Sequence, residues 1–432
     1  MNISSVRNYN FNTDIVLKYL IIFVPITIMI GNFILNINII LIDLIFLSFL
    51  SKKKILLKKK IYLILLFLST ICTFNIFYSS NINLSIQGSL GLLKYIIFFF
   101  ALVHFLDNDE NKNLFFKFVF YVILFVIIDV FIQYFFGKDI FGFEYSMAHG
   151  KRLSGPFGDE YVVGAYISKL SYLGLFYLIN LKKNYIFLFS YLCLIVVSVF
   201  ITQERSAFFI TIISSVFFIS VSKFNIKYKI YFLLSLCIFL GLFLKIDKSS
   251  YDKYLKLTPL QLGMSKDIHK RVADINSPNN HKIDSFWDSR YGAHFLTAYN
   301  MYIDNKVIGS GIKTFRSACK LDKYGNIESL YADKRCNTHP HNIYFEILSE
   351  GGLIIFIPFS LTVLFFVIYN FKNLFSNKNY IISVTNLSLI IVLFFPIQTT
   401  GSFFSTFNGV FYWIGAAVIV QNLKYDFFRR SI

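Results

Sequence analysis

The sequence predicts an all-α polytopic membrane protein with about twelve transmembrane helices and one large, partly helical loop on the outer side. Three observations support this fold class. The 432 residues are 56% hydrophobic and only 15% charged, whereas soluble domains carry roughly 25% charged residues. Apolar runs of about 20 residues, the length that crosses a bilayer core, recur along most of the chain. A single long interior segment, residues 247–341, is polar.

The apolar runs predict the domain organisation. We place spans near residues 14–31, 34–50, 61–78, 86–106, 114–136, 162–180, 185–202, 207–222, 230–246, 342–369, 380–397 and 409–422. No cleavage site of small residues follows the first run, which favours a retained span over a signal peptide. The chain then divides into an N-terminal block of about nine spans (1–246), a loop domain (247–341) and a C-terminal block of about three spans (342–432).

Lysine placement predicts the orientation. The net charge of +18 is typical of nucleic-acid binding, but the lysines cluster in short loops between spans, which is the positive-inside pattern. We therefore expect no nucleic-acid partner. We assign the lysine-rich loops and both termini to the cytoplasm, and residues 137–161, 203–206 and 247–341 to the outer side of the membrane.

The long loop is expected to be structured. Tyr291, Phe295, Ala298 and Tyr302 recur at helical spacing and predict a helix over residues 288–305, and the glycines that follow favour a turn. The remaining cysteines fall in apolar runs, but Cys319 and Cys336 both lie in this loop. In an oxidising periplasm they could form a disulfide, with two free thiols as the alternative.

Arginine is distributed against the positive-inside rule. Six of nine arginines fall on the predicted outer side. The nine are Arg7, Arg152, Arg205, Arg271, Arg290, Arg316, Arg335, Arg429 and Arg430. The planar guanidinium suits phosphate and carboxylate, so this bias predicts an anion site at the outer face.

The outer arginines differ in how strongly they favour function. For Arg271, Arg316 and Arg335 we favour ion pairs within the loop. Arg205 lies between two apolar spans, where its charge is costly to desolvate, and it favours a function. Neutralisation of Arg205 by Glu204 is the alternative.

The strongest local signal is Thr338-His339-Pro340-His341-Asn342, directly before an apolar run. Proline suits the first turn of a helix, so we expect His341 inside that turn. The positive end of a helix favours a neutral imidazole, which can act as a general base, and it also attracts phosphate. A purely structural cap is one alternative. The sequence supports a metal site less strongly, because the two histidines do not share a helix face and no third ligand has a telling spacing. We therefore expect no metal and no cofactor.

Several short motifs appear in a fixed order along residues 140–400. They are Arg152–Gly158 before a span, Gln203–Ala207 between two spans, Ser289-Arg290 opening the loop helix, Asn305–Phe315, His341-Asn342 and Gly351-Gly352-Leu353. In this order, set against about twelve spans, the sequence resembles the O-antigen ligase and O-antigen polymerase superfamily. Ile355 departs from the family pattern, which often has a small residue there, without touching the chemistry.

The resemblance implies an inverting, metal-independent glycosyltransferase of the GT-C type. Such an enzyme takes a glycan from undecaprenyl diphosphate on the periplasmic face. By matching positions, His341 would activate the acceptor hydroxyl, while Arg205 and Arg290 would stabilise the diphosphate leaving group. We expect Arg152, His339 and Asn342 to assist by contacting substrate. Whether His339 or His341 is the base stays open here.

Four functions remain to be distinguished. A ligase transfers the glycan to the lipid A-core of lipopolysaccharide, and this is our first hypothesis. A polymerase, which joins lipid-linked repeat units of O-antigen or exopolysaccharide, is the alternative. A transporter of lipid-linked sugars is less favoured, because the polar residues concentrate outside the spans and no inverted repeat is evident. A non-catalytic assembly subunit would have no use for His341 and Arg205.

Overall fold

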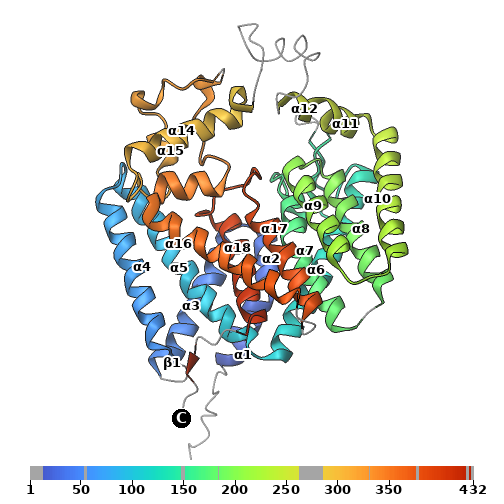
Figure 1. Ribbon diagram of the computed structural model, residues 1–432, viewed down its shortest axis with the longest axis horizontal. Coiled ribbons are helices and arrows are strands. Elements are labelled where there is room, and N and C mark those ends of the chain that lie inside the picture. Colours follow the sequence, from blue (N-terminus) through green and yellow to red (C-terminus); the bar gives the residue numbers. More distant parts are fainter. Residues whose placement is uncertain are drawn as a thin grey trace, which may run out of the picture.

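The computed structural model describes residues 13–52, 56–146, 151–182, 184–261, 286–329, 331–375, 379–424 and 428–429. Arg7, Arg271 and Arg430 lie outside these ranges, as do His149, His269 and His281. The described chain is a bundle of long helices with a smaller helical layer on one end (Figure 1).

Each predicted span coincides with a helix. The bundle consists of α1 (Thr13–Ile22), α2 (Val24–Ile30), α3 (Asn32–Ser51), α4 (Lys59–Phe77), α5 (Ile82–Leu106), α6 (Asp109–Phe136), α7 (Val163–Asn180), α8 (Tyr185–Ile201), α9 (Arg205–Val221), α10 (Ile226–Ile246), α16 (Ile343–Asn373), α17 (Tyr380–Phe394) and α18 (Thr406–Asn422). The first predicted span forms two helices, bent by 54° between α1 and α2. Pro25 lies in the first turn of α2, where it cannot continue the preceding helix.

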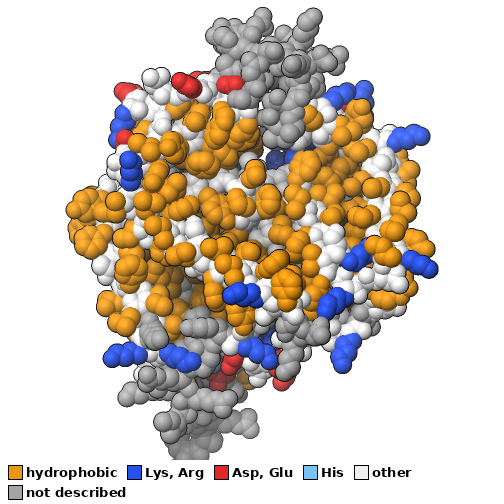
Figure 2. Space-filling view, in the orientation of Figure 1, with side chains coloured by type: hydrophobic (Ala, Val, Ile, Leu, Met, Phe, Trp, Pro, Cys, Tyr) orange, Lys and Arg blue, Asp and Glu red, His pale blue; other side chains and the backbone are white. Residues whose placement is uncertain are grey.

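The bundle has the surface of a multi-pass membrane protein. Among the described helices, five are long and apolar enough to cross a bilayer, or six if the bent pair α1–α2 is one span. The count of twelve spans therefore stays a prediction. Hydrophobic side chains cover most of the face in Figure 2, and lysine and arginine side chains lie mainly towards its edges, with several along its lower part. This separation is typical of a protein surrounded by lipid.

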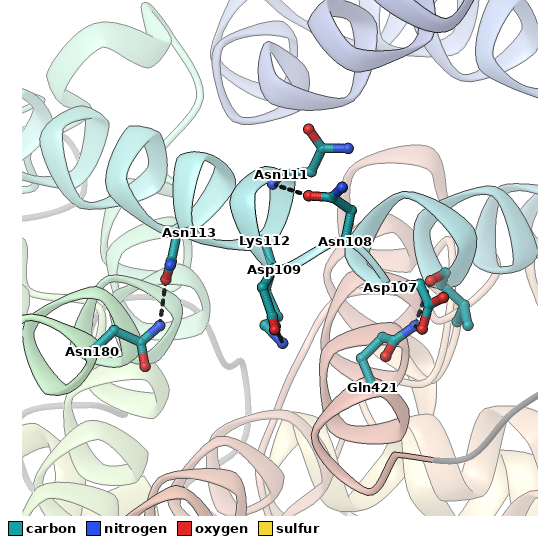
Figure 3. A network of polar contacts seen from close by, with 9 residues as sticks. Asp107, Asn108, Asp109, Asn111, Lys112, Asn113, Asn180 and Gln421 are labelled. Carbon is teal, nitrogen blue, oxygen red and sulfur yellow. Dashed lines mark hydrogen bonds and ion pairs between the residues drawn. The ribbon is translucent and has the colours of Figure 1, made fainter.

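The two ends of the bundle differ in character. At one end β1 (Leu56–Leu57) pairs with β2 (Phe428–Arg429), and the turn between α5 and α6 forms the network in Figure 3. In that network Asn113 accepts a 2.7 Å hydrogen bond from Asn180 at the end of α7. Gln421 at the end of α18 donates to the carbonyl of Val103 at 2.6 Å. Short polar contacts of this kind fasten the helix ends on the side predicted to be cytoplasmic.

The opposite end carries the polar loop. It contains the short helices α11 (Lys248–Tyr251), η2 (Asp252–Leu257), α12 (Thr258–Gln261) and η3 (Phe286–Asp288), then α14 (Arg290–Asp304), α15 (Phe315–Ala318), η4 (Asp322–Tyr324) and η5 (Ala332–Lys334). Helix α14 occupies the position expected for the loop helix. Met301 and Phe315 lie in a small core of their own, and Phe295 stacks on Phe345 of α16 with ring centroids 4.7 Å apart. The loop is therefore a packed cap on the bundle.

The disulfide lies inside this cap. Cys319 and Cys336 are joined by a disulfide across 17 residues of sequence, and Cys319 is fully buried in the small core. Arg335 donates from Nε to the carbonyl of Cys319 at 3.1 Å. The disulfide thus ties the segment that leads into α16 to the small core of the cap.

A break in α16 fixes the cap to the membrane helices. Gly352 has φ +63° and interrupts the helix, which frees the amides of Leu353 and Ile354. These amides donate to the carbonyls of Lys306 and Val307 at 2.9 and 3.1 Å. The pairing supplies partners for amides that the break leaves without hydrogen bonds inside the helix.

The neighbouring contact, between Gly309 and Glu350, depends on a glycine and on the buried side-chain amide of Asn75. A Cβ on Gly309, whose φ is +80°, would lie 2.4 Å from the carbonyl of Glu350. Asn75 of α4 is fully buried and donates to the carbonyls of Ile308 and Glu350 at 2.8 and 2.9 Å. The glycine segment is therefore a docking element as well as a turn.

We predict that Gly309→Ala destabilises the protein by at least about 2 kcal/mol, because the new methyl group would force the two backbones apart and strain a left-handed residue. Thermal unfolding of the purified full chain in detergent measures this change. The control is Gly91→Ala in α5, where a Cβ would meet nothing within 4 Å. Equal melting temperatures for the two variants would contradict the docking role.

Candidate functional site

The start of α16 differs from the prediction. The helix begins at Ile343, and Asn342 is its N-cap: its side-chain oxygen accepts from the amides of Tyr344 and Phe345 at 2.9 and 3.2 Å. The expectation that His341 lies inside the first turn is therefore wrong. His341 precedes the cap, with φ +61°. Asparagine is among the strongest N-cap residues, which explains why the helix begins after it and not at Pro340.

Asn342 is fully engaged within the protein. Its side-chain nitrogen donates to the carbonyls of Pro396 and Gln398 at 2.7 and 3.3 Å, and the residue is buried. Both amide atoms are thus used in internal bonds. The structure favours a role in holding the neighbouring His341 over the substrate contact expected from the sequence.

An irregular segment between α17 and α18, residues 395–405, holds the histidines in place. The amide of Thr400 donates to the carbonyl of His341 at 2.8 Å. Ser206, in the first turn of α9, donates to the carbonyl of Thr399 at 2.5 Å. Buried Glu346 of α16 accepts from the amide of Phe403 at 2.6 Å. We did not anticipate this segment, although its run of polar residues between two apolar helices is visible in the sequence.

Three histidines and a tyrosine converge at this point. The ring centroid of His341 lies 4.3 Å from that of His339, 5.3 Å from that of His294 and 5.5 Å from that of Tyr291. Tyr291 and His294 come from α14 of the cap, which meets the two other histidines here. The sequence analysis assigned no role to His294, whose only signal was its position one helical turn after Arg290.

Hydrogen bonds distinguish the two histidines proposed as the base. The Nε2 atom of His339 lies 3.2 Å from the carbonyl oxygen of Thr400, and its Nδ1 atom lies 2.8 Å from the hydroxyl of Thr338. A carbonyl only accepts, so His339 donates from Nε2. The Nε2 atom of His341 lies 2.9 Å from the side-chain nitrogen of Asn337. An amide nitrogen only donates, so this Nε2 atom accepts and carries the lone pair.

All three imidazoles are held neutral. Burial lowers the pKa of His294 and of His339 from 6.5 to about 4. Burial, followed by the neighbouring His339, His294 and Arg290, lowers the pKa of His341 from 6.5 to about 3. Desolvation penalises the charged ring, and nearby positive groups add to the effect.

Arg205 is the least satisfied cation of the site. It is the first residue of α9 and half-buried, and it makes no hydrogen bond or ion pair to any residue that the structure describes. Its electrostatic neighbours are Tyr291 and Tyr254, followed by Arg152. Burial lowers the pKa of Arg205, which marks a guanidinium held in a poorly solvated place.

Glu204 does not neutralise Arg205 in the way the alternative required. Its carboxylate accepts from the amides of Gly164 and Ala165 at 2.6 and 3.2 Å, and so caps the start of α7. Burial raises the pKa of Glu204 to about 7, against the lowering effect of Arg152 and other partners. The carboxylate of Glu204 therefore serves as a cap for α7.

Arg152 lies near Arg205, whereas Arg290 lies near the histidines. Arg152 donates to the carbonyl of Tyr161 at 2.8 Å and leaves its buried Nε atom without a partner among the described residues. Arg290 opens α14, is exposed, and acts electrostatically on His294 and His341.

Lys253 is a further cation that the sequence analysis did not single out. It lies on η2, where burial first, and then the nearby Arg152 and Arg205, lower the pKa of Lys253 from 10.5 to about 8. Nothing in the sequence marks one lysine among so many. Lys253 makes the predicted anion site more strongly positive than the arginines alone would.

Arg335 and Arg316 are the two remaining outer arginines within the described ranges. Arg335 donates to the carbonyls of Cys319 and Ala332 and makes no ion pair with a described residue, so the ion pair expected for it is not found among those residues. Arg316 is exposed on α15. Within the described ranges, no three side chains among His, Cys, Asp and Glu are arranged to hold a metal ion.

A comparison with protein families places this site in context. Residues 189–360 match the family model described as O-antigen ligase. This match supports the O-antigen ligase superfamily as the family of the chain. The matched region contains Arg205, Arg290 and His341, and the match supports a membrane glycosyltransferase of the O-antigen ligase or polymerase type. No curated protein matches the chain.

We predict that the histidines make the cap sensitive to acid. In the unfolded chain a histidine binds a proton near pH 6.5, whereas folded His339 does so only near pH 4. Between these values the unfolded state binds more protons, so stability falls as the pH drops. Melting temperatures of the full chain at about pH 7 and pH 5 measure the fall.

The matched variant isolates the histidine contribution from that of buried acids such as Glu204, whose raised pKa acts in the opposite direction. His339→Gln removes one titrating ring, so its melting temperature should change less between the two pH values than that of the unaltered chain. An equal or larger change in the variant would contradict a buried, neutral His339.

Proposed function

We propose that this protein is an O-antigen ligase that transfers a glycan from undecaprenyl diphosphate to the lipid A-core. The reaction would take place on the periplasmic face of the bacterial inner membrane. The observation that carries the proposal is Arg205, a half-buried guanidinium that pairs with none of the described residues, beside the cluster that contains His341. A desolvated cation of this kind is costly to keep unless a ligand neutralises it.

The donor would bind through its diphosphate. Arg205 and Arg290 approach the histidine cluster from the bundle and from the cap, with Arg152 and Lys253 close to Arg205. Guanidinium groups bind phosphate oxygens in a bidentate manner. As the anomeric C–O bond breaks, these cations would stabilise the negative charge that develops on the departing diphosphate.

His341 is the better choice of base over His339. The Nε2 lone pair of His341 meets only the side chain of Asn337, which a substrate hydroxyl can replace. The Nε2 atom of His339 already carries its proton and gives it to Thr400, and its other nitrogen contacts Thr338. We therefore assign His339 to holding the segment and His341 to taking the proton of the acceptor hydroxyl.

The pKa of His341 suggests an order of events. At about 3 it is low for a general base at neutral pH. One of its causes is Arg290, and a diphosphate bound there would offset that positive charge and raise the pKa. Donor binding would thus make the base competent, so that proton removal follows the arrival of the donor.

The first test measures the roles of His341 and Arg205 by substitution. We expect His341→Ala to reduce transfer at least about 100-fold, since it removes the base. Arg205→Lys should reduce it about tenfold or more, since lysine keeps the charge but loses the planar fork. Both are measured as glycan transfer by the purified full chain with undecaprenyl-diphosphate glycan and lipid A-core.

Controls separate these effects from general damage. Lys320→Ala removes an exposed cation from the same cap and should leave transfer unchanged. Normal surface glycan in both the His341 and Arg205 variants would contradict the proposal and favour a non-catalytic assembly subunit.

The second test distinguishes the ligase from the polymerase. In a deletion strain, a ligase defect removes all O-antigen bands from a lipopolysaccharide gel and leaves polymer on the lipid carrier. A core bearing a single repeat unit would instead identify a polymerase and overturn the ligase proposal. Accumulation of the lipid-linked glycan on the cytoplasmic face would point to a transporter.

A further inference from the structure

His294 is a buried polar residue that neither the fold nor the proposed mechanism uses. It lies on α14 one turn after Arg290 and is fully buried, yet neither ring nitrogen has a hydrogen-bond partner among the described residues. Neighbouring Thr297, equally buried on the same helix, bonds to the carbonyl of Ala293 at 2.8 Å. A neutral imidazole carries one donor and one acceptor, and leaving both unmet is unfavourable. An apolar side chain would fill a purely structural position better.

The ring of His294 faces that of His341 at a suitable separation. Their centroids are 5.3 Å apart and their planes meet at 77°. A hydrogen bond of about 2.9 Å between two imidazole nitrogens joins rings whose centroids are roughly 5 Å apart. Rotation of the rings alone would therefore bring a nitrogen of each into contact, without movement of α14 or of the segment before α16.

Other side chains near His341 are less suited to this contact. His339 lies closer, at 4.3 Å between centroids, but its two nitrogens are engaged with Thr400 and Thr338. Tyr291 lies at 5.5 Å and offers the face or edge of its ring. His294 is the one neighbour on the cap that brings a free acceptor nitrogen to His341, among the residues that the structure describes.

Resting on the proposed function, we propose that His294 is a positioning residue for His341, accepting a hydrogen bond from the Nδ1–H of His341 while the Nε2 atom acts on the acceptor sugar. In the structure the Nε2 lone pair faces Asn337. When the acceptor hydroxyl replaces Asn337, His294 fixes the opposite edge of the ring. It selects the tautomer that leaves Nε2 free as the base.

The proton and electron balance of the step is complete without any other reactant. The acceptor oxygen forms its bond to the anomeric carbon and gives its proton to Nε2 of His341. The C–O bond to the diphosphate breaks, and its electron pair leaves with the diphosphate. His341 then carries a proton on each nitrogen, and His294 accepts the hydrogen bond from Nδ1 until Nε2 releases its proton to water.

The charged and titratable groups around the pair come from three elements. Arg290 and Tyr291 lie on α14, His339 lies on the segment before α16, and Arg316 of α15 acts electrostatically on His339. The positive groups oppose formation of a charged His341 ring. As a neutral hydrogen-bond acceptor among these positive groups, His294 would stabilise the protonated His341 ring.

The test uses the purified full chain in lipid nanodiscs, with undecaprenyl-diphosphate glycan and lipid A-core as probes. His294→Leu keeps the side chain buried but cannot accept a hydrogen bond. It should lower kcat about tenfold and leave KM for the donor within about twofold, since the donor contacts are unaltered. His294→Gln offers an acceptor oxygen and should recover most of the kcat.

Two further measurements separate positioning from packing. In His294→Leu, the lower limb of the kcat profile over about pH 5 to 9 should shift, because the pKa of bound His341 changes. Thr297→Val removes a polar group at an equally buried site of α14 and should leave both kcat and its pH profile unaltered. Melting temperatures show whether each variant is folded.

The outcomes decide both proposals separately. If His341→Ala abolishes transfer but His294→Leu retains normal kcat, the role of His294 is overturned while the proposed function stands. Equal losses in His294→Leu and His294→Gln, with an unshifted pH profile, would also overturn it and indicate packing alone. If His341→Ala retains transfer, the proposed base itself is wrong.

Discussion

The docking of the cap on the broken helix α16 is the constraint on which the rest of the structure depends. Gly352 interrupts the helix, and the backbone at Lys306 and Val307 fills the missing hydrogen bonds. The closeness of Gly309 to Glu350 leaves no room for a side chain, and Asn75 fastens the same place from α4. Because these bonds hold the backbone of the cap against α4 and α16, the cap is kept in a fixed register. That register brings α14 against the start of α16.

A second fastening arrives from the other side of the bundle. The segment between α17 and α18 connects Thr399 to Ser206 of α9, and Thr400 to both His339 and His341. A few hydrogen bonds of this segment thus connect α9 with the histidines before α16, which lie far apart in sequence. His341 is supported from the cap, from α16 and from this segment, which suits a residue whose orientation decides its chemistry.

The electrostatics of the site follow from its place between cap and bundle. Burial keeps the histidines neutral and leaves Arg205 poorly solvated, because it disfavours the charged form of each group. An anionic donor would relieve both at once, by neutralising the arginines and removing the charge that depresses the pKa of His341. The low polarity of the site would also strengthen the contacts to a bound diphosphate.

The sequence by itself determined where the helices lie, because long apolar runs have few alternatives in a bilayer and hydropathy is a local property. Residue types also pointed to Arg205, Arg290 and His341, since cations on the predicted outer side stand out in a lysine-rich chain. The exact start of α16 was missed because Asn342 competes with Pro340 as the helix-initiating residue, and side-chain capping decides the outcome. The convergence of His294 with His341, the role of Glu204 as a cap and the position of Lys253 depended on tertiary structure alone. These contacts join segments distant in sequence, and only the packing of the cap on the bundle brings them within reach of one another.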